Sequence, residues 1–519
     1  MSATASHPGP FRRLLQAADR GLNRLYGWKY NPIYQSGTLV VVLFVVLLVT
    51  GLWLLFFYRI GAPWDSVARL TASRWTGNWV RGLHRIASDA AVVAVAVHAL
   101  RMLVQRRSWG PRTLAWVSGI GLTVVVLVCG WTGFVMVWDT FGLALADEGA
   151  RLFEAVPLLS EPIRRTFSGE RPVPSAFFFL NLFLHVALPL GLGLLLWLHV
   201  SRVARPVLWP PRALAWGAVA VLLIAAVAWP VPMFPRADPL VIPDRIGLSW
   251  FYGFWLPITQ SLSPGVVWAG VLALTALALM VPWLTRPRQP PAPSEVNQAL
   301  CTGCTQCSLD CPYEAITMVA RTDGRAGEVA RVDGSRCVSC GICAGSCAPM
   351  GIGPPGCDGR SQLSRVRQFI QSPALVPGDL VVMGCVQAVG DRAEEFQAMG
   401  ARWLPVDCVG NLHTSTVEFC LRAGAAGVLI LTCPPRDCTH REGPRWLHAR
   451  LYQGREAELK ERVDRRRIQV AAVTAGDALA AITALARFGE QLAVLGRPSL
   501  EPEDSLDAEC ETAAVGEDS

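Results

Sequence analysis

The stretch from Asn78 to Leu103, NWVRGLHRIASDAAVVAVAVHALRML, is an apolar run that contains two histidines, His84 and His98, fourteen residues apart. In an α-helix this interval turns the two side chains to within about 40° of the same face and separates them by about 21 Å along the axis. The run is also long enough to cross a bilayer. The spacing therefore predicts a membrane helix that presents one imidazole at each of two depths.

A second apolar run, Phe177 to His199, repeats the interval with His185 and His199. Two such helices side by side would offer two pairs of axial ligands, His84 with His185 and His98 with His199. Each pair could bind a haem iron through imidazole nitrogens. The alternative is that each is a hydrogen-bonded interhelical histidine, an ordinary role for a single one in a membrane. Because the two spacings are identical, we favour two haems.

Four glycines in neighbouring apolar runs follow the same interval: Gly37 and Gly51, and Gly119 and Gly133. A haem between helices needs neighbours without a Cβ atom so that its edge can approach the backbone. Ordinary small-residue helix packing would explain any one of these glycines. Four glycines at the histidine interval favour the cofactor.

Two arginines flank the first histidine pair, Arg81 three residues before His84 and Arg101 three residues after His98. A guanidinium near each membrane face could pair with haem propionates. The alternative for each is that it only extends its charge to the interface.

Composition divides the chain into a membrane part and a soluble part. Of the 519 residues 52% are hydrophobic, and 17 of the 19 tryptophans lie within the first 285 positions. The net charge of +7 arises mainly from short segments between apolar runs, where it indicates orientation rather than nucleic-acid binding. Twelve of the sixteen cysteines lie in patterned groups, which indicates metal sites in a reducing compartment rather than disulfides.

Six membrane spans are expected in the first 285 residues. Arginine and lysine concentrate in the head and after the second, fourth and sixth spans, although four arginines between the first two spans weaken this bias. This predicts an inner (cytoplasmic) membrane protein with both termini and all later domains in the cytoplasm. The expected spans are Thr38–Tyr58, Leu83–Val104, Leu114–Val137, Phe177–Val200, Leu214–Val231 and Pro264–Leu284.

The segment from Tyr30 to Pro206, including WVRGLHRIASDAAVVAVAVHALRM and GPRTLAWVSGIGLTVVVLVCGWTGFVMVWD, resembles the cytochrome b family of quinol-oxidising complexes. The resemblance implies a quinone partner and a homodimer through this part. It also implies that His84 and His185 hold a haem near the outer face, and that the other pair holds one near the cytoplasm.

Two features depart from that family. Ala237 to Ile258 looks like its loop before the sixth span, but where the family has Pro-Glu-Trp-Tyr this chain has Leu248-Ser249-Trp250-Phe251. The missing acid puts ordinary quinol oxidation at the outer face in doubt. The branch with a third haem has an anchoring cysteine, and 33–37 has none, so two haems are expected.

A proline-rich stretch, PRQPPAP at 287–293, precedes two repeats of CxxCxxCxxxC. Thiolates at this spacing bind cubane iron-sulfur clusters, and in two-cluster ferredoxins the fourth cysteine of each run binds the other cluster. Structural zinc is the alternative. The region from about Glu295 to Pro355 resembles bacterial two-cluster ferredoxins. The expected sets are Cys301, Cys304, Cys307 and Cys347 for one [4Fe-4S] cluster, and Cys337, Cys340, Cys343 and Cys311 for the other.

From residue 378 onward, short β-branched runs alternate with helical stretches, the pattern of a parallel α/β sheet. Three expected strands end in cysteine and a fourth cysteine follows closely, which predicts a [2Fe-2S] cluster at the carboxyl edge. Zinc and buried free thiols are the alternatives. VDCVGN and LTCPPRDCTHREG resemble the delta subunit of the methyl-viologen-reducing hydrogenase, although that family usually has a further cysteine where this chain has Ala388. The four candidates are Cys385, Cys408, Cys433 and Cys438.

The expected fold is multidomain: an all-α transmembrane bundle (1–285), a proline-rich linker (286–294), an α+β ferredoxin domain (295–356), an α/β domain (378–495) and an acidic disordered tail (500–519). No pattern indicates a covalent nucleophile or a hydrolytic dyad. The resemblances imply an electron-transfer subunit between the quinone pool and a cytoplasmic flavin or iron-sulfur oxidoreductase of heterodisulfide reductase type. A membrane-anchored docking scaffold without quinone chemistry is the alternative, and His413, His440 and the other cysteines are expected to be structural.

Overall fold

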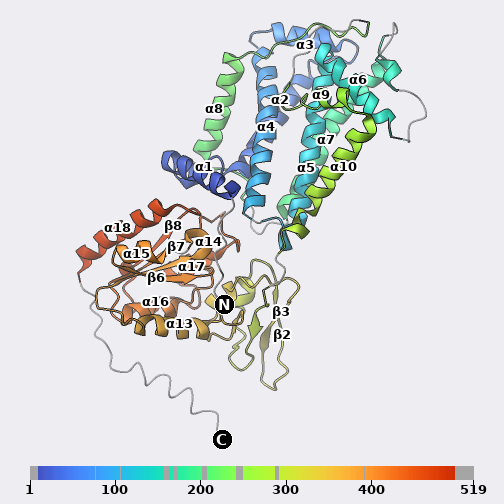
Figure 1. The fold of residues 1–519 in the computed structure, drawn as a ribbon. Coiled ribbons are helices and arrows are strands. Elements are labelled where there is room, and N and C mark those ends of the chain that lie inside the picture. The colour runs from blue at the N-terminus through green and yellow to red at the C-terminus, as the bar shows by residue number, and fades with distance from the viewer. Residues whose placement is uncertain are drawn as a thin grey trace. The chain divides into compact units, whose positions relative to one another are not determined.

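A computed structural model describes residues 10–75, 77–105, 107–156, 163–167, 172–201, 207–240, 249–286, 291–390, 392–435 and 437–496. The chain forms two compact units, Leu22–Pro287 and Met1–Gly21 with Arg288–Ser519 (Figure 1). The acidic tail, Leu248 and part of the proline-rich linker lie outside the described residues.

The first unit is entirely helical, as the sequence predicts. Helix α1 (Pro10–Tyr26) precedes it and crosses the boundary between the two units. The remaining helices are α2 (Ser36–Leu55), α3 (Pro63–Ala72), α4 (Asn78–Val104), α5 (Thr113–Val137), α6 (Thr140–Glu154), α7 (Ser175–Ser201), α8 (Arg212–Ala228), α9 (Leu256–Ser261) and α10 (Pro264–Leu284), with 3-10 turns η1 (Trp28–Tyr30), η2 (Gly110–Arg112) and η3 (Ile163–Thr166).

Five of the six expected spans are helices long and apolar enough to cross a membrane: α2, α4, α5, α7 and α10. The fifth expected span is α8, which has 17 residues and is the shortest of the set. At 1.5 Å per residue it is about 26 Å long, near the lower limit for a span. The helical membrane part of the predicted fold is thus confirmed, with one short helix.

Helix α2 packs along α4, and α5 packs along α7. Fully buried Ala87 and Ala91 bring α4 close to its neighbours, and Gly82 lies against Ala226 of α8. The short helices α3, α6 and α9 gather at one end of the bundle (Figure 1). These small residues let α2 and α8 pack closely against α4.

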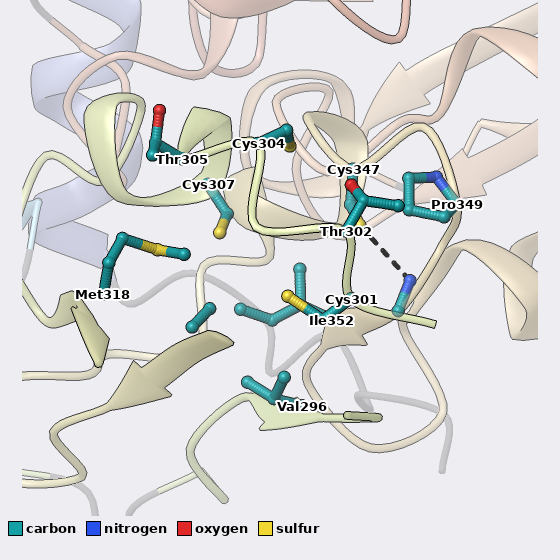
Figure 2. A pocket seen from close by; sticks show the side chains of 12 residues that line it. Val296, Cys301, Thr302, Cys304, Thr305, Cys307, Met318, Cys347, Pro349 and Ile352 are labelled. Carbon is teal, nitrogen blue, oxygen red and sulfur yellow. Dashed lines mark hydrogen bonds between the residues drawn. The ribbon is translucent and has the colours of Figure 1, made fainter. Parts of the chain in front are cut away.

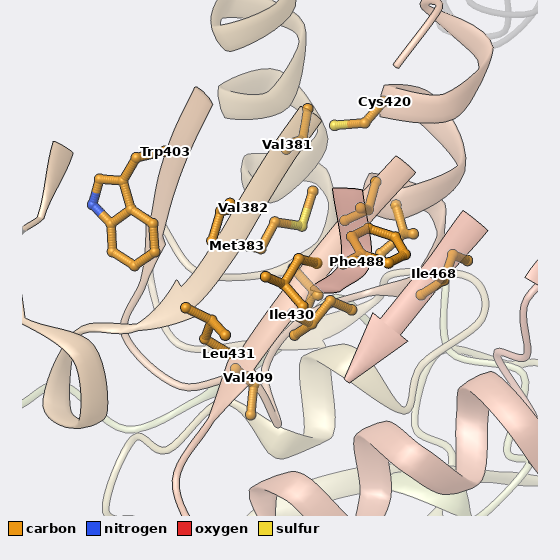
Figure 3. Close-up of a cluster of buried hydrophobic side chains, with 14 of the residues drawn as sticks. Val381, Val382, Met383, Trp403, Val409, Cys420, Ile430, Leu431, Ile468 and Phe488 are labelled. Carbon is orange, nitrogen blue, oxygen red and sulfur yellow. The ribbon is translucent and has the colours of Figure 1, made fainter. Parts of the chain in front are cut away.

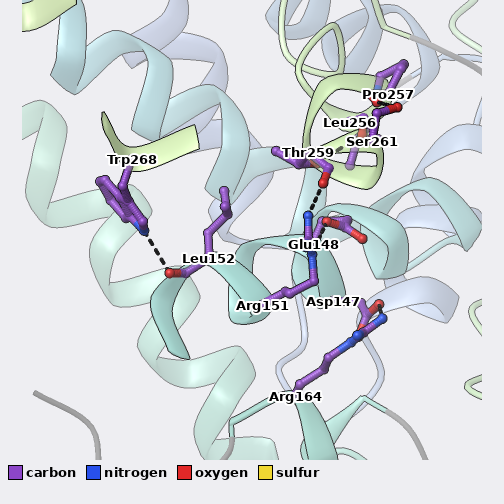
Figure 4. A network of polar contacts seen from close by, with 10 residues as sticks. All are labelled: Asp147, Glu148, Arg151, Leu152, Arg164, Leu256, Pro257, Thr259, Ser261 and Trp268. Carbon is purple, nitrogen blue, oxygen red and sulfur yellow. Dashed lines mark hydrogen bonds and ion pairs between the residues drawn. The ribbon is translucent and has the colours of Figure 1, made fainter. Parts of the chain in front are cut away.

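Polar contacts fix the end of the bundle where α6 lies (Figure 4). Arg151 binds Glu148 at 2.9 Å and also donates to the Thr259 carbonyl of α9. The Trp268 indole of α10 donates to the Leu152 carbonyl at 2.8 Å. Helix α6 is therefore held to both later helices by its own backbone and side chains.

The second unit contains two small antiparallel sheets and one parallel sheet. The small sheets pair β1 (Glu295–Val296) with β4 (Ile352–Gly353) and β2 (Ile316–Ala320) with β3 (Glu328–Val332). The parallel sheet has the order β6-β5-β7-β8, with β5 (Leu380–Cys385), β6 (Ala401–Val406), β7 (Gly427–Thr432) and β8 (Ile468–Ala472). The helices of the second unit are α11 (Gln306–Leu309), α12 (Ile342–Gly345), α13 (Gly359–Gln371), α14 (Val386–Val389), α15 (Ala393–Ala398), α16 (Thr414–Arg422), α17 (Gly443–Tyr452) and α18 (Ala478–Leu495), with turn η4 (Arg465–Arg467).

The core of the parallel sheet centres on β5 and β7, whose residues Val381, Val382, Met383, Ile430 and Leu431 are fully buried (Figure 3). Strand β7 is buried along its whole length, as a central parallel strand covered on both faces must be. This confirms the predicted parallel α/β domain. Strand β8 was not predicted, because its sequence lacks a cysteine end and follows a long irregular stretch.

Helix α18 is also long and apolar enough to span a membrane. However, Phe488 and Leu492 of this helix are buried and lie against Gly427 of β7, where a Cβ would come within 2.8 Å of the Phe488 ring. Helix α18 is therefore a cover for the parallel sheet.

Candidate functional site

The structure places the four histidines in two facing pairs. The ring centres of His84 and His185 are 6.3 Å apart, and those of His98 and His199 are 6.4 Å apart. An imidazole nitrogen lies about 2 Å from a metal it binds, and the ring centre about 1 Å beyond it, so two rings on opposite sides of one iron have centres about 6 Å apart. Both pairs have the separation that a shared haem iron requires.

Each histidine ring lies against one of the four glycines that share its spacing. A Cβ built at Gly37 would come within 2.8 Å of His98 Cε1, and one at Gly133 within 3.0 Å of His185 Cε1. The corresponding distances are 3.2 Å from Gly51 to His84 and 3.3 Å from Gly119 to His199. The glycines thus make room for the imidazole rings, whereas we predicted that they make room for the haem edge.

A hydroxyl residue precedes every one of these glycines, a regularity of the sequence for which we predicted no role. Thr50 Oγ1 lies 2.9 Å from His84 Nδ1, Thr132 Oγ1 lies 3.0 Å from His185 Nδ1, and Ser118 Oγ lies 3.2 Å from His199 Nδ1. Each hydroxyl also donates to a helix carbonyl, so it accepts from the imidazole. This arrangement places the proton on Nδ1 and leaves Nε2 free to bind iron. Ser36, which precedes Gly37, is the exception, because its buried Oγ has no hydrogen-bond partner among the described residues.

The two flanking arginines are held by protein groups. Arg81 donates to Thr71 Oγ1 at 3.1 Å and to the Val231 carbonyl at 3.0 Å. Arg101 is buried, donates to the Ile33 carbonyl at 2.9 Å and lies over the Tyr34 ring. Both arginines therefore fix connecting segments of the bundle. A contact of either with a haem propionate stays a prediction.

Near the His84 end of the bundle, Arg85 pairs with Asp89 of the same helix and donates to Ser249 Oγ at 3.2 Å. The side chains of this pair are about a quarter exposed. Tyr252 lies beside them, with its hydroxyl 2.7 Å from Ser88 Oγ. Arg85 thus connects Ser249, where the resembling family has an acid, to the acid Asp89 on α4.

The first predicted cubane set, Cys301, Cys304, Cys307 and Cys347, lines one cavity (Figure 2). Apart from these thiols, the cavity is lined mainly by apolar residues such as Val296 and Ile352. The Gly351 N–H donates to Cys347 Sγ at 3.2 Å, the kind of N–H to sulfur contact that stabilises thiolate ligands. The four thiols and their surroundings fit a cubane cluster.

The second predicted set lines a separate cavity. Backbone N–H groups of Ala315 and Ser294 donate to two of its thiols, at 3.4 Å each. In both sets the structure places the fourth cysteine of one run with the first three of the other. The second set comprises Cys311, Cys337, Cys340 and Cys343.

The last four cysteines meet at the carboxyl edge of the parallel sheet. Cys385 ends β5 and Cys433 directly follows the neighbouring strand β7, and their sulfurs are 3.6 Å apart. The Cys438 thiol is within hydrogen-bond reach of both Cys408 and Cys433. Gly443 lies against the same group, since a Cβ there would come within 2.9 Å of Cys408 Sγ.

Among the described residues, no three His, Cys, Asp or Glu side chains converge on a point suited to a single metal ion.

We expect the other histidines and cysteines of the soluble unit to be structural, and the contacts of three of them fit this prediction. His413 caps α16 by accepting from the Ser415 N–H at 3.2 Å, and burial lowers its pKa to about 4, so the ring is neutral. Cys420 is fully buried in the core of the parallel sheet. Cys357 lies 3.7 Å from a carboxylate oxygen of Asp407 and outside all three cysteine groups.

Three families of known proteins match three successive segments of the chain: the one with the histidine pairs, the one with the two cysteine runs, and the one with the parallel sheet. Residues 25–205 match the cytochrome b/b6/petB family, residues 300–351 the 4Fe-4S dicluster domain, and residues 383–496 the methyl-viologen-reducing hydrogenase delta subunit.

Among relatives, the chain is 29% identical to the menaquinol:cytochrome c reductase cytochrome b subunits of Geobacillus thermodenitrificans and Bacillus subtilis (strain 168). The first match covers 33% of this chain and 79% of the relative, and the second covers 31% and 75%. A solved structure of a hyperthermophilic respiratory Complex III matches with 19% identity and a TM-score of 0.40, over 49% of this chain and 75% of that one.

The helices of the first unit and its family match make this a multi-pass membrane protein of electron transport, with segments of haem-binding and [4Fe-4S]-binding families. The chain is a fusion of a cytochrome b-type membrane segment, a 4Fe-4S dicluster segment and a segment of the hydrogenase delta-subunit family.

Proposed function

We propose that the protein transfers electrons between the quinone pool and a cytoplasmic flavin or iron-sulfur oxidoreductase of heterodisulfide reductase type. Two b-type haems, held by His84 with His185 and by His98 with His199, connect the two membrane faces. Two [4Fe-4S] clusters and a [2Fe-2S] cluster continue the path in the cytoplasm. The two relatives are named as menaquinol-oxidising subunits, which supports a menaquinol-type substrate.

The observation that carries this proposal is the presence, in one chain, of two histidine pairs with ring centres 6.3 and 6.4 Å apart and three grouped sets of four cysteines. A haem supplies one-electron transfer when bound, and the clusters do the same. The role of the chain is to hold each centre in a fixed place and to keep water away from it.

The test is anaerobic reduction of the purified, haem-loaded, full-length protein by menaquinol or duroquinol, followed by optical and low-temperature EPR spectroscopy. We expect the α-band of reduced b-type haem to appear first and cluster signals to follow. Haems that stay oxidised with every quinol would overturn the proposal.

A second candidate function is a membrane-anchored docking scaffold without quinone chemistry. The serine at 249, where the resembling family has an acid, favours it. The same experiment separates the two, because a scaffold would contain haem that no quinol reduces.

For the first function we propose Asp89 as the proton acceptor at the outer quinol site. Oxidation of a quinol to a quinone releases two electrons and two protons. Haems held by the two histidine pairs would accept the electrons, and Asp89 would pass on the protons one at a time. Arg85 supports this role, since it binds the Asp89 carboxylate and Ser249 Oγ together. We expect Asp89→Asn to slow quinol-driven haem reduction by roughly 10²-fold, the contribution of one positioned acid or base, at unchanged haem content.

The control is Asp65→Asn, which removes an acid that pairs with Arg236 on the bundle surface. Adding Ser249→Glu to Asp89→Asn returns a carboxylate to the site and should restore part of the rate. Unchanged reduction in Asp89→Asn would refute this role while leaving the proposed function intact.

A further inference from the structure

Arg450 of α17 lies where the dicluster segment meets the α/β segment, and it is the largest fully buried side chain among the described residues. Its Nη2 donates to the Gly410 carbonyl at 2.7 Å, and its Nη1 donates to Ser346 Oγ at 3.2 Å. Gly345 is required beside it, because a Cβ there would clash with Nη1. One guanidinium therefore bridges two segments inside a single unit.

Within the described part of the chain, no carboxylate forms an ion pair with Arg450. The buried acid Asp310 instead binds Arg455 at 2.6 Å and Ser346 Oγ at 2.7 Å. Arg450 Nε is buried and has no hydrogen-bond partner. Although burial lowers the pKa of Arg450 to about 10, the side chain remains a cation at neutral pH. Asp310 binds the same Ser346 hydroxyl and acts on the Arg450 charge, but without an ion pair it compensates the buried cation only in part, and a further anion nearby would stabilise it.

Two cysteine groups meet at this cation. Arg450 Nη1 lies 3.5 Å from the carbonyl of Ile342, next to Cys343 of the second cubane set, and Nη2 binds the carbonyl of Gly410, two residues after Cys408 of the last group. Gly341, next to Cys340, lies against Asn411, three residues after Cys408. A cluster bound by thiolates is an anion, and it gains a further negative charge on reduction. A fixed cation beside it therefore stabilises the reduced state more than the oxidised one.

We propose that Arg450 is the counter-cation shared by the second cubane set and the last cysteine group, and that it raises the reduction potentials of both clusters. Arg450 is a positioning residue. By raising these potentials it favours an electron on the clusters at the junction of the two segments, before the electron passes to the soluble partner. This inference rests on the cluster ligation in the proposed function. It does not depend on the quinone chemistry.

The test is an EPR-monitored redox titration of the full-length protein in detergent, with iron content measured for every variant. Arg450→Gln keeps an amide donor without the charge, and Arg450→Lys keeps the charge. We expect Arg450→Gln to lower the reduced-to-oxidised ratio of both neighbouring clusters at least tenfold at a given ambient potential, or 59 mV for a one-electron couple. In Arg450→Lys, the reduced-to-oxidised ratio of these two clusters should stay within threefold of wild type. In both variants, the ratio of the first cubane should stay within the same limit.

Arg467→Gln is the matched control, because Arg467 is also buried and donates to the Ala426 and Gly496 carbonyls at 3.0 Å each. An equal shift in this variant would overturn the proposal, as would an iron-replete Arg450→Gln protein with wild-type potentials. If Arg450→Gln loses iron, Arg450→Lys decides: wild-type potentials support the proposal and shifted ones refute it. Wild-type protein without cluster signals would overturn the ligation itself, and with it both proposals.

Discussion

The two units bring their ligands together in different ways. In the membrane unit, all four histidines lie on α4 and α7, and each ring faces a glycine on α2 or α5. In the soluble unit, most cysteines lie on loops and strand ends, and each cubane set takes one member from the other run. Helical ligands depend on the period of the helix, whereas loop ligands depend on local backbone turns and on contacts between segments.

This difference predicts how each site fails. A helical site should lose its cofactor when one imidazole ring is removed or when the facing glycine is replaced by a larger residue, while the bundle stays folded. A loop site should lose its cluster together with local order, because thiolate binding is part of what stabilises such loops.

The largest expected effect is that of His98→Ala. Because we propose His98 as a ligand of one of two haems, we expect haem content to fall by half in a pyridine haemochrome assay of the membrane-extracted protein. His448→Ala changes a histidine on α17 of the soluble unit and should leave haem content unchanged. A full haem complement in His98→Ala would refute the inner pair.

A comparable loss is expected at the sheet edge for Cys438→Ala. The Cys438 thiol contacts two of the other three, so its removal should abolish the EPR signal of the third cluster while both cubane signals remain. Cys420→Ala is the control: this thiol is buried in the core away from the site, and we expect it to affect stability only. If all three cluster signals persist in Cys438→Ala, the last ligand set is wrong.

An intermediate effect is expected for Gly37→Ala. The new Cβ would lie 2.8 Å from His98 Cε1, so the ring must move, and we expect a lowered inner-haem occupancy and an altered α-band. Gly121→Ala adds the same methyl group to α5 with no atom within 4 Å. That variant should bind haem normally and gain up to about 1 kcal/mol of helix stability. Equal haem loss in both variants would show that the added methyl group acts through helix propensity, and not through the space that Gly37 leaves for the His98 ring.

The smallest effect is expected for Thr132→Val, which removes the hydroxyl beside His185 Nδ1 but keeps the side-chain shape. The Cys129 carbonyl, 2.9 Å from Nδ1, can still accept its proton. We therefore expect retained haem with a shifted outer midpoint potential and roughly tenfold weaker haem affinity at most. In Thr123→Val the lost hydroxyl is one that donates to the Gly119 carbonyl at 2.9 Å, and the haem midpoint potential should not move.

Patterns with a fixed period were predictable from the sequence. The fourteen-residue interval determined which face of the helix carries both histidines, because helix geometry is the same in every context. The CxxCxxCxxxC runs and the cysteines at strand ends predicted three ligand groups, and the structure gathers the same residues. Strand β8 and the role of α18 were not predictable, since both depend on packing against β7.

What the sequence by itself determined are the local periods, the family resemblances and the grouping of cysteines by spacing. Only the tertiary structure decided that a hydroxyl beside each of three glycines accepts from a histidine on another helix. The tertiary structure also decided that Arg450 is buried between two segments. Both depend on contacts between residues far apart in the chain, and the spacing within one segment does not specify such contacts.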